Sequence, residues 1–162
     1  MSIAQLMQEP RPRSTRLDLE IAGTSRSLSL VRRLLDTCTR HQRLQPQVLN
    51  DVKLAVAEAC TNVIRHAFQF DPTRRFGLNI QVSDRYFLVQ LQYEDARFDP
   101  GTIPQPDLNN LREGGLGVYI MRHIMDVVEY ATDPPTRTVT LRMMKRISPD
   151  DAGGQSENRY QG

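Results

Sequence analysis

One long amphipathic helix constrains the fold of this chain more than any other segment. Pro46 suits the first turn of a helix, because its backbone already has a helical φ angle. Asp71-Pro72 ends the pattern. Between them, apolar residues recur at helical spacing, at Val48, Val52, Val56, Ala59, Val63 and Ala67. They form one apolar stripe, which a second layer of structure must cover.

The same helix carries a polar ladder formed by Glu58, Asn62 and His66. An i,i+4 step turns a helix by only about 40° and rises about 6 Å, so the three side chains lie on one side of it. A carboxylate in this position can take a proton from a hydroxyl group. An amide oxygen one turn away is a suitable ligand for Mg²⁺. A ladder of this kind is also typical of a solvated helix face, so the helix alone does not decide between these readings.

Apolar periodicity predicts further helices and strands. Leu17, Leu19 and Ile21 alternate with acidic residues, which is the period of a strand. Ser83-Asp84-Arg85 is short enough to join two strands as an antiparallel hairpin. In chain order, we expect a strand over 16–21, a helix through Leu28 to Cys38 capped by Thr24 or Ser25, the helix described above, strands over 76–82 and 86–93, a helix over 115–125, and strands over 126–131 and 138–144.

This order favours an α+β fold. Helices and strands do not alternate one for one, so we expect a two-layer sandwich in which three helices cover one face of a mixed, mostly antiparallel sheet. A doubly wound parallel sheet is the alternative. We expect a flexible N-terminal segment over 1–15, one domain over 16–146 and a disordered polar tail over 147–162.

Composition argues against several classes of function. The net charge of +2 gives no electrostatic footprint for nucleic acid, and the pairs Arg74-Arg75 and Lys145-Arg146 are interpreted as solvated surface. Cys38 and Cys60 lie in helical patterns without a CxxC pair, which disfavours a zinc site. We find no signal peptide and no apolar run near the ~20 residues that span a bilayer. We therefore expect a cytoplasmic protein without membrane contact.

A glycine turn stands directly before the helix at 115–125. Gly114-Gly115-Leu116-Gly117 leaves backbone N–H groups open at a helix N-terminus, where anions bind and glycine lets a phosphate approach. The long stretch from Glu94 to Glu113 is interrupted by prolines and can close over a ligand as a lid. Taken alone, a glycine-rich helix entry is more often an ordinary turn.

Taken together, these motifs resemble the ATPase fold shared by histidine kinases, gyrase and MutL, the Bergerat-type fold. Within it, the chain is most similar to the anti-sigma-factor serine/threonine kinases of bacterial partner-switching systems. The similarity covers roughly residues 16–145. It rests on Glu58-x₃-Asn62-x₃-His66-Ala67, on Phe98-Asp99-Pro100 and on Glu113-Gly114-Gly115-Leu116-Gly117-Val118-Tyr119-Ile120-Met121.

The resemblance implies a role for each matching residue. Glu58 would be the base that activates the attacking hydroxyl, and Asn62 would hold Mg²⁺. Arg32 on the first long helix, with its neighbour Arg33, would contact the partner protein. The nucleotide would be bound by Asn62 together with His66, Asp95, Gly115, Leu116, Gly117 and Thr138 or Thr140.

The segment expected to hold adenine departs from the family. The family pattern is Asp-x-Gly-x-x-Phe-Asp, in which the first Asp accepts a hydrogen bond from the adenine amino group. Aligned without gaps on Phe98-Asp99, this chain has Tyr93 at the Asp position; with a loop two residues shorter, Asp95 takes it. The glycine is missing in both cases. An unpaired amine costs about 1–3 kcal/mol, or about ten- to a hundredfold in affinity. We therefore expect weak ATP binding, or binding that tightens when a partner closes the site.

The resemblance implies a kinase that transfers the γ-phosphoryl group of Mg-ATP to a serine or threonine of a STAS-type anti-anti-sigma protein. The same protein would bind a sigma factor or another partner in the alternative state, because the added phosphate breaks the first contact. Family members are often dimers, so the resemblance allows a homodimer. The alternative is a partner-binding module with a degenerate site. A two-component sensor is a weaker alternative, because no dimerising hairpin with a phosphoacceptor histidine is present.

Overall fold

A five-stranded sheet in the order β1-β2-β3-β5-β4 forms one layer of the protein. The computed structural model describes residues 2–8, 14–42, 44–103 and 115–148. Ser83 closes the predicted β2–β3 hairpin, because its Oγ accepts hydrogen bonds from the backbone N–H groups of Arg85 and Tyr86 at 3.3 and 3.1 Å. The strands are β1 (Thr15–Ala22), β2 (Arg75–Val82), β3 (Tyr86–Glu94), β4 (Val127–Asp133) and β5 (Thr138–Arg146).

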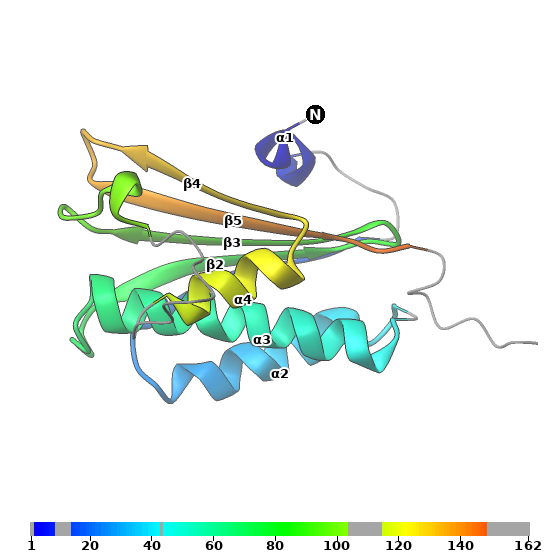
Figure 1. Cartoon of the computed structure of the whole chain (residues 1–162). Coiled ribbons are helices and arrows are strands. Elements are labelled where there is room, and N and C mark those ends of the chain that lie inside the picture. Colours follow the sequence, from blue (N-terminus) through cyan, green and yellow to red (C-terminus); the bar gives the residue numbers. More distant parts are fainter. Residues whose placement is uncertain (1, 9–13, 43, 104–114, 149–162) are drawn as a thin grey trace, which may run out of the picture.

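Three helices form the second layer, along one face of this sheet (Figure 1). They are α2 (Ser27–Thr39), α3 (Pro46–Asn62) and α4 (Leu116–Ile124). The predicted α+β sandwich is therefore confirmed. The sheet is not mixed, however, because every pairing among the described strands is antiparallel. The helix α4 connects β3 to the edge strand β4, and β5 then returns between them, antiparallel to both.

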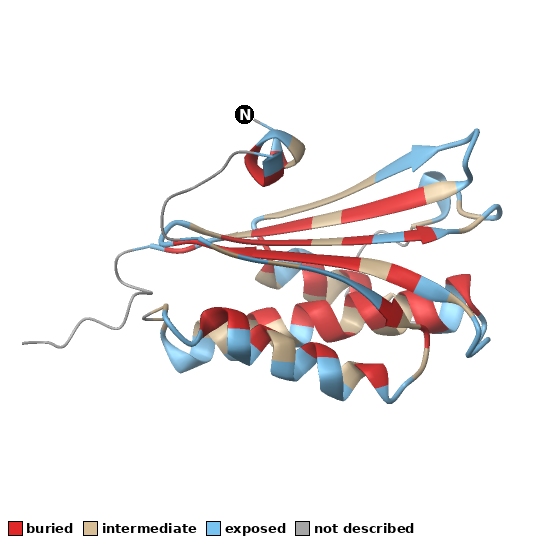
Figure 2. Ribbon diagram, turned by 180° about the vertical axis from the view of Figure 1, so that it is seen from behind, coloured by how far each residue is buried: buried red, intermediate tan, exposed pale blue. Residues whose placement is uncertain are grey.

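The core lies between the sheet and the helices, where Figure 2 shows buried residues on the facing sides of both layers. Successive residues of a strand point to opposite faces of the sheet. Alternate residues of β3 and β5 therefore pack against the apolar stripe of α3. The buried cluster includes Val89, Leu91 and Tyr93 of β3, Val139, Leu141 and Met143 of β5, and Val52, Val56, Ala59 and Cys60 of α3.

The α-helical part of the long helix ends at Asn62, earlier than the predicted Ala67. Val63–Ala67 continues it as a π-helical turn, and the N–H of Phe68 donates to the carbonyl of Val63 at 2.9 Å. The predicted cap of α2 is wrong. This helix begins at Ser27, and Arg26 precedes it without a side-chain capping bond. Thr24 instead belongs to a turn, where its carbonyl accepts from the N–H of Ser27 at 2.9 Å.

A short helix, α1 (Ile3–Gln8), lies within the segment that we expected to be flexible. It sits on the face of the sheet opposite the other helices (Figure 1). Ile3, Leu6 and Met7 have helical spacing and are buried with Leu88 and Met144. In addition, Gln81 Nε2 donates to the carbonyl of Met7 at 2.7 Å. The three apolar residues stand among polar residues and prolines, so the local sequence did not predict this helix. Its apolar side packs against the sheet.

The described residues contain no helix that is long and apolar enough to cross a membrane. The same residues contain no group of three or more His, Cys, Asp or Glu side chains that could hold a metal ion. Ile147, expected in the tail, is buried, and its N–H donates to the carbonyl of Arg85 at 2.8 Å. The rest of the predicted tail, residues 149–162, lies outside the described residues.

Candidate functional site

The helix α3 places Glu58 and Asn62 one turn apart at the border of the core. Both side chains are half-buried, whereas the neighbouring Ala59 and Cys60 are fully buried. Burial raises the pKa of the Cys60 thiol from 9.0 to about 12, so this cysteine is a core residue and not a nucleophile. The predicted position of the carboxylate and the amide, beside the apolar stripe, is therefore observed.

Gly117 of α4 brings the second motif directly against the first. A Cβ atom built on Gly117 would lie 2.8 Å from Glu58 Oε2 and 3.5 Å from both side-chain polar atoms of Asn62. A side chain at residue 117 would displace the Glu58 carboxylate, so glycine is what allows this close approach with the carboxylate in place. The two motifs, which are far apart in the sequence, therefore meet in one place.

The N-terminus of α4 faces this meeting point. Gly115 precedes the helix, and its carbonyl accepts from the N–H of Tyr119 at 3.1 Å, the first helical bond. The N–H groups of the first turn have no partner within the helix and favour an anion. The Leu116 side chain is 50% exposed and packs little. Gly114 lies outside the described residues.

This donor set fits Mg²⁺ and a phosphate group. An amide oxygen is a hard ligand of the kind that Mg²⁺ accepts beside waters and phosphate oxygens. Asn62 supplies this oxygen, with the Glu58 carboxylate beside it, and Gly117 places no side chain between them and the start of α4. The open backbone of α4 supplies N–H groups to the phosphate.

Tyr93 and Asp95 follow each other on the helix-facing side of β3. The N–H of Asp95 donates to the carbonyl of Arg137 at 2.9 Å, so sheet pairing continues past the end of β3 and keeps the alternation. Tyr93 is only 7% exposed, and its ring meets Phe68 edge-on at 6.3 Å. The Asp95 side chain is 11% exposed, and its Oδ1 accepts from the N–H of Arg97 at 3.0 Å. Both residues that the alignment left open for the adenine position therefore face the helices.

The five other predicted site residues lie on β5, on the π-helical turn and on α2. Thr138 begins β5 opposite Glu94, and its hydroxyl accepts from Thr136 Oγ1 at 2.8 Å. Alternation with buried Val139 places the side chains of Thr138 and Thr140 on the face of the sheet away from α3. His66 is exposed on the π-helical turn, which departs from α-helical spacing and breaks the ladder. Arg32 and Arg33 are exposed on α2.

Sequence reasoning missed Arg74, which was interpreted as solvated surface. Its guanidinium lies 4.4 Å from the centre of the Phe68 ring. It donates to the carbonyl of Ala67 at 2.7 Å and to that of Glu94. Arg74 thereby ties the end of the π-helical turn to the end of β3. A dipeptide of arginines carries no signal for this role, because the two carbonyls belong to different elements, the π-helical turn and β3.

An aromatic pair that the sequence did not predict stands near the end of β3. The rings of Phe98 and Tyr130 stack with their centres 5.4 Å apart. Both side chains pack against the main core. They add a flat apolar wall on the side of the sheet where Tyr93 and Asp95 lie.

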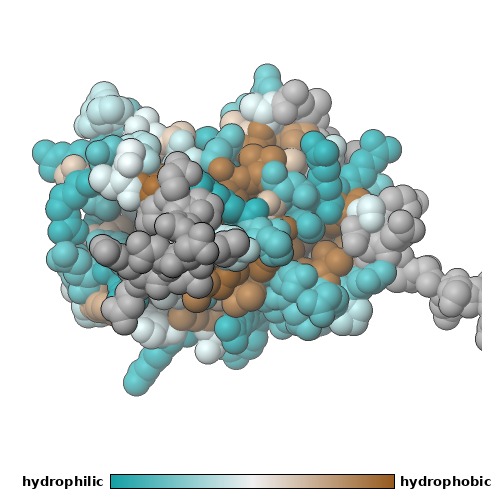
Figure 3. Space-filling view, in the orientation of Figure 1, coloured by the Kyte–Doolittle hydropathy of each residue, from teal (hydrophilic) through white to brown (hydrophobic). Residues whose placement is uncertain are grey.

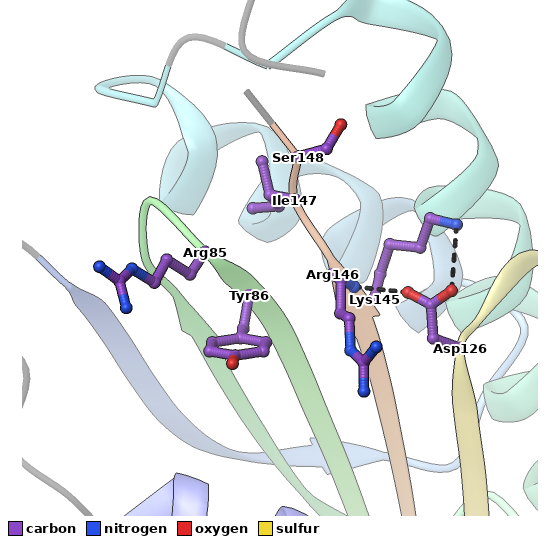
Figure 4. Close-up of a pocket in the computed structure, with 7 residues that line it drawn as sticks. All are labelled: Arg85, Tyr86, Asp126, Lys145, Arg146, Ile147 and Ser148. Atoms are coloured by element: carbon purple, nitrogen blue, oxygen red, sulfur yellow. Dashed lines mark hydrogen bonds and ion pairs between the residues drawn. The ribbon is translucent and has the colours of Figure 1, made fainter. Parts of the chain in front are cut away.

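A separate pocket opens near the β2–β3 turn (Figure 4). Its main polar feature is Asp126, whose Oδ2 accepts from the N–H of Arg146 at 2.6 Å and whose Oδ1 lies 3.8 Å from Lys145 Nζ. None of the predicted site residues lines this pocket, and its carboxylate is already paired. Its lining is formed by Arg85, Tyr86, Asp126, Lys145, Arg146, Ile147 and Ser148.

Apolar surface gathers over α3 and α4 on the face shown in Figure 3. Leu54 and Leu116 are among the exposed large apolar residues, at 42% and 50%. Leu54 lies one turn before Glu58 on α3, and Leu116 is the neighbour of Gly117. Exposed apolar side chains therefore flank the carboxylate at the point where the two motifs meet.

Comparison with known proteins gives consistent findings. Residues 21–143 match the family described as "Histidine kinase-like ATPase domain". The chain is 33% identical over 113 residues to "Serine-protein kinase RsbW" of Bacillus licheniformis, covering 64% of this chain and 70% of that protein. It is 28% identical over 141 residues to the protein of the same name from Bacillus velezensis, covering 82% and 86%.

A solved structure shows the same fold. The structure of the RsbU and RsbW domains of a Mycobacterium tuberculosis protein superposes with a TM-score of 0.58 at 13% identity. The match covers 85% of this chain and 33% of that chain, so the likeness concerns one part of a larger protein. At this level of identity it supports the fold and not the activity.

Proposed function

Because this chain belongs to the histidine kinase-like ATPase family and is RsbW-like, we propose that it is an anti-sigma regulatory factor with serine/threonine kinase activity. It transfers the γ-phosphoryl group of Mg-ATP to a serine or threonine of a STAS-domain anti-anti-sigma protein in the cytoplasm. The observation that carries this proposal is the approach of Gly117 to Glu58 and Asn62. A scaffold without chemistry has no need to hold a carboxylate and an amide against a glycine at a helix N-terminus.

Each residue of the site has a distinct task in the proposed reaction. Glu58 takes the proton of the attacking serine or threonine hydroxyl while the oxygen of that hydroxyl bonds to the γ-phosphorus. The bond between the γ-phosphorus and the β,γ-bridging oxygen breaks at the same time, and ADP leaves. Asn62 would hold Mg²⁺, which neutralises phosphate charge when bound. The backbone N–H groups at the start of α4 would hold the phosphates. Gly117 keeps Glu58 within reach of the reacting atoms.

The acceptor in this proposal is a protein and not a small molecule. The exposed Leu54 and Leu116 flank Glu58, and exposed apolar residues beside a site are typical of protein contacts. Arg32 and Arg33 on exposed α2 add positive charge for the partner. A phosphate on the antagonist adds close to two negative charges, which would break its contact and leave the surface to a sigma factor.

Calorimetry with Mg-ADP and Mg-ATP, followed by a phosphotransfer assay with the STAS-domain partner, tests the proposal. Glu58→Gln should abolish transfer while nucleotide binding stays, because the amide cannot act as a base. Asn62→Ala should weaken the Mg²⁺-dependent part of binding. If no nucleotide binds at millimolar concentration, with or without partner, the kinase proposal is refuted.

A non-catalytic partner-binding module of the same fold is the second candidate. The buried Tyr93 favours it, because a core-filling ring stands at one of the two positions aligned with the family's adenine carboxylate. Under this alternative, the partner binds with equal affinity in the presence and absence of Mg-ATP, and Glu58→Gln leaves the affinity for the partner unchanged.

A further inference from the structure

Among the described residues, Phe70 is the most exposed of the large apolar side chains. It is 62% exposed, whereas the other exposed large apolar residues lie between 37% and 50%. It stands in the loop of residues 68–74 (the Phe70 loop), which joins the π-helical turn to β2. An aromatic ring is a large apolar surface whose burial is favourable. The backbone and the charges around this ring show what its exposure serves.

The backbone at this ring has an uncommon conformation. Gln69 and Phe70 have φ angles of 51° and 63°, in the left-handed region that residues other than glycine seldom adopt. Each such residue costs free energy, and strained residues of this kind are concentrated at functional sites. The chain therefore holds an exposed phenylalanine at a position where the fold alone would favour glycine.

Hydrogen bonds fasten the Phe70 loop although it is exposed. The N–H of Phe70 donates to the carbonyl of Ile64 at 2.9 Å, and the N–H of Asp71 donates to that of Phe68 at 2.9 Å. Asp71 Oδ1 accepts from the N–H and the hydroxyl of Thr73 at 2.9 and 2.7 Å. These bonds order the backbone from which the ring projects. A segment that is ordered before binding loses less entropy on association, which suits an interface anchor.

Guanidinium groups border the Phe70 loop. Arg74 Nη1 and Arg97 Nη2 donate to the same oxygen, the carbonyl of Ala67, at 2.7 and 3.5 Å. Two positive charges therefore meet at a point three residues before Phe70. Arg65 adds a third charge, because it is exposed on the π-helical turn.

The carboxylates beside these arginines offset only part of their charge. Asp71 already accepts two bonds from Thr73, and Asp95 Oδ1 lies 3.9 Å from Arg97 Nε. Arg75 adds a further exposed guanidinium group at the start of β2. An apolar ring within a net positive border complements an apolar pocket that is bordered by carboxylates.

The Phe70 loop lies within the area that a protein bound at Glu58 would cover. It leaves the end of α3 at the same end of the molecule where α4 begins (Figure 1). The N–H of Phe70 is bonded to the carbonyl of Ile64, which follows Glu58 by six residues along the same helix. Six helical residues rise only about 9 Å. A standard interface covers about 800 Å² of each partner, which is a patch about 30 Å across.

We propose that Phe70 is an anchor for the acceptor protein, and that its ring enters an apolar pocket bordered by carboxylates on that protein. This inference rests on the proposed function, because it names the surface that holds the protein substrate. A second copy of this chain is disfavoured as the occupant, since docking through the same loop would bring two sets of arginines together.

Titration of the full chain with the STAS-domain partner tests the inference, in Mg-ADP so that no transfer occurs. Phe70→Ala should weaken the affinity for the partner about thirtyfold or more, the loss typical of an aromatic hot spot. In phosphotransfer it should raise the KM for the partner and leave kcat unchanged, because the ring takes no part in the chemistry. Its melting temperature and its affinity for Mg-ADP should stay unchanged. Leu19→Ala, at an exposed apolar residue of β1, is the matched control and should keep partner affinity.

Arg65→Gln is an independent second variant that tests the charge of the border. It should weaken partner affinity about two- to fivefold at low salt, the range of an exposed ion pair. The loss should come mainly from slower association and should disappear at high ionic strength. A loss that is the same at low and high salt would contradict an acidic border on the partner.

The outcomes separate this inference from the proposed function. If wild-type protein transfers phosphate and Phe70→Ala binds the partner within twofold of wild type, the inference is wrong and the proposed function stands. If Phe70→Ala instead dissociates a homodimer and keeps partner affinity, the ring binds a second copy and the inference is overturned. If wild-type protein binds the partner but transfers no phosphate from Mg-ATP, the proposed function is refuted, whereas thirtyfold weaker binding by Phe70→Ala still supports the docking surface.

Discussion

Replacing Gly117 with alanine probes the contact on which the candidate site depends. The new Cβ atom would lie 2.8 Å from Glu58 Oε2, whereas ordinary contact begins at 3.4 Å. The carboxylate must therefore move by about 0.6 Å, the difference between these two distances. Glu58 is a flexible side chain on the surface of the core, so it can move without unfolding the helix. The Asn62 atoms, at 3.5 Å, need not move.

The substitution should separate activity from stability. A misplacement of about 1 Å in a catalytic group can cost about a hundredfold in rate, so a shift of this size should lower phosphotransfer about ten- to a hundredfold. The free energy of unfolding should stay the same or rise by up to about 1 kcal/mol, because alanine is the better helix former. Nucleotide affinity should change much less than the transfer rate.

The measurement is kcat/KM for phosphotransfer to the STAS-domain partner, with urea unfolding of the same samples. Gly77→Ala is the matched control, because its Cβ would lie 3.7 Å from the nearest atom, in ordinary contact. It should keep full activity. If Gly117→Ala transfers phosphate as fast as Gly77→Ala, the carboxylate of Glu58 is not the positioned base.

Two further predictions concern the core around the site. Gly23→Ala should destabilise the fold by about 1–3 kcal/mol. The new Cβ atom would lie 2.8 Å from Cε2 of the Phe68 ring and 3.1 Å from the carbonyl oxygen of Arg74. A urea midpoint equal to that of wild type would contradict this prediction. Burial raises the pKa of the Cys60 thiol from 9.0 to about 12. Between these pH values the unfolded chain releases the thiol proton and the folded chain keeps it, so the free energy of unfolding falls as the pH rises. Urea unfolding at several pH values above 9 should show a loss of up to about 1.4 kcal/mol per pH unit that Cys60→Ala removes, and an identical slope in both proteins would refute the assignment.

The regular elements could be predicted because local spacing encodes them. The stripe from Val48 to Ala67 predicted α3 and its extension, and Ser83 to Arg85 predicted the β2–β3 hairpin. A helical or strand period depends only on neighbours within a few residues. The short helix α1 was not predicted, because three apolar residues are too few to show a helical period. The outer face of the sheet, against which α1 packs, is formed by residues far away in the sequence.

The candidate site was predictable in part, for a similar reason. Glu58 and Asn62 follow from helical spacing, and their side chains lie where that spacing puts them. The surroundings of the Thr138 side chain depend on the register of β5 against β3, which no local pattern contains. Arg74 was missed because its acceptors, the carbonyls of Ala67 and Glu94, come together only when α3 packs on the sheet.

By itself, the sequence determined the three helices that cover the sheet, the five strands and the two motifs with their order along the chain, since these depend on spacing and residue type. Only the tertiary structure decided that Gly117 lies against Glu58, and that Tyr93 is buried with its ring edge-on to Phe68. Contacts of this kind join segments that are distant in the chain. They depend on strand order, register and the packing of one layer on another, which act only once the whole chain has folded.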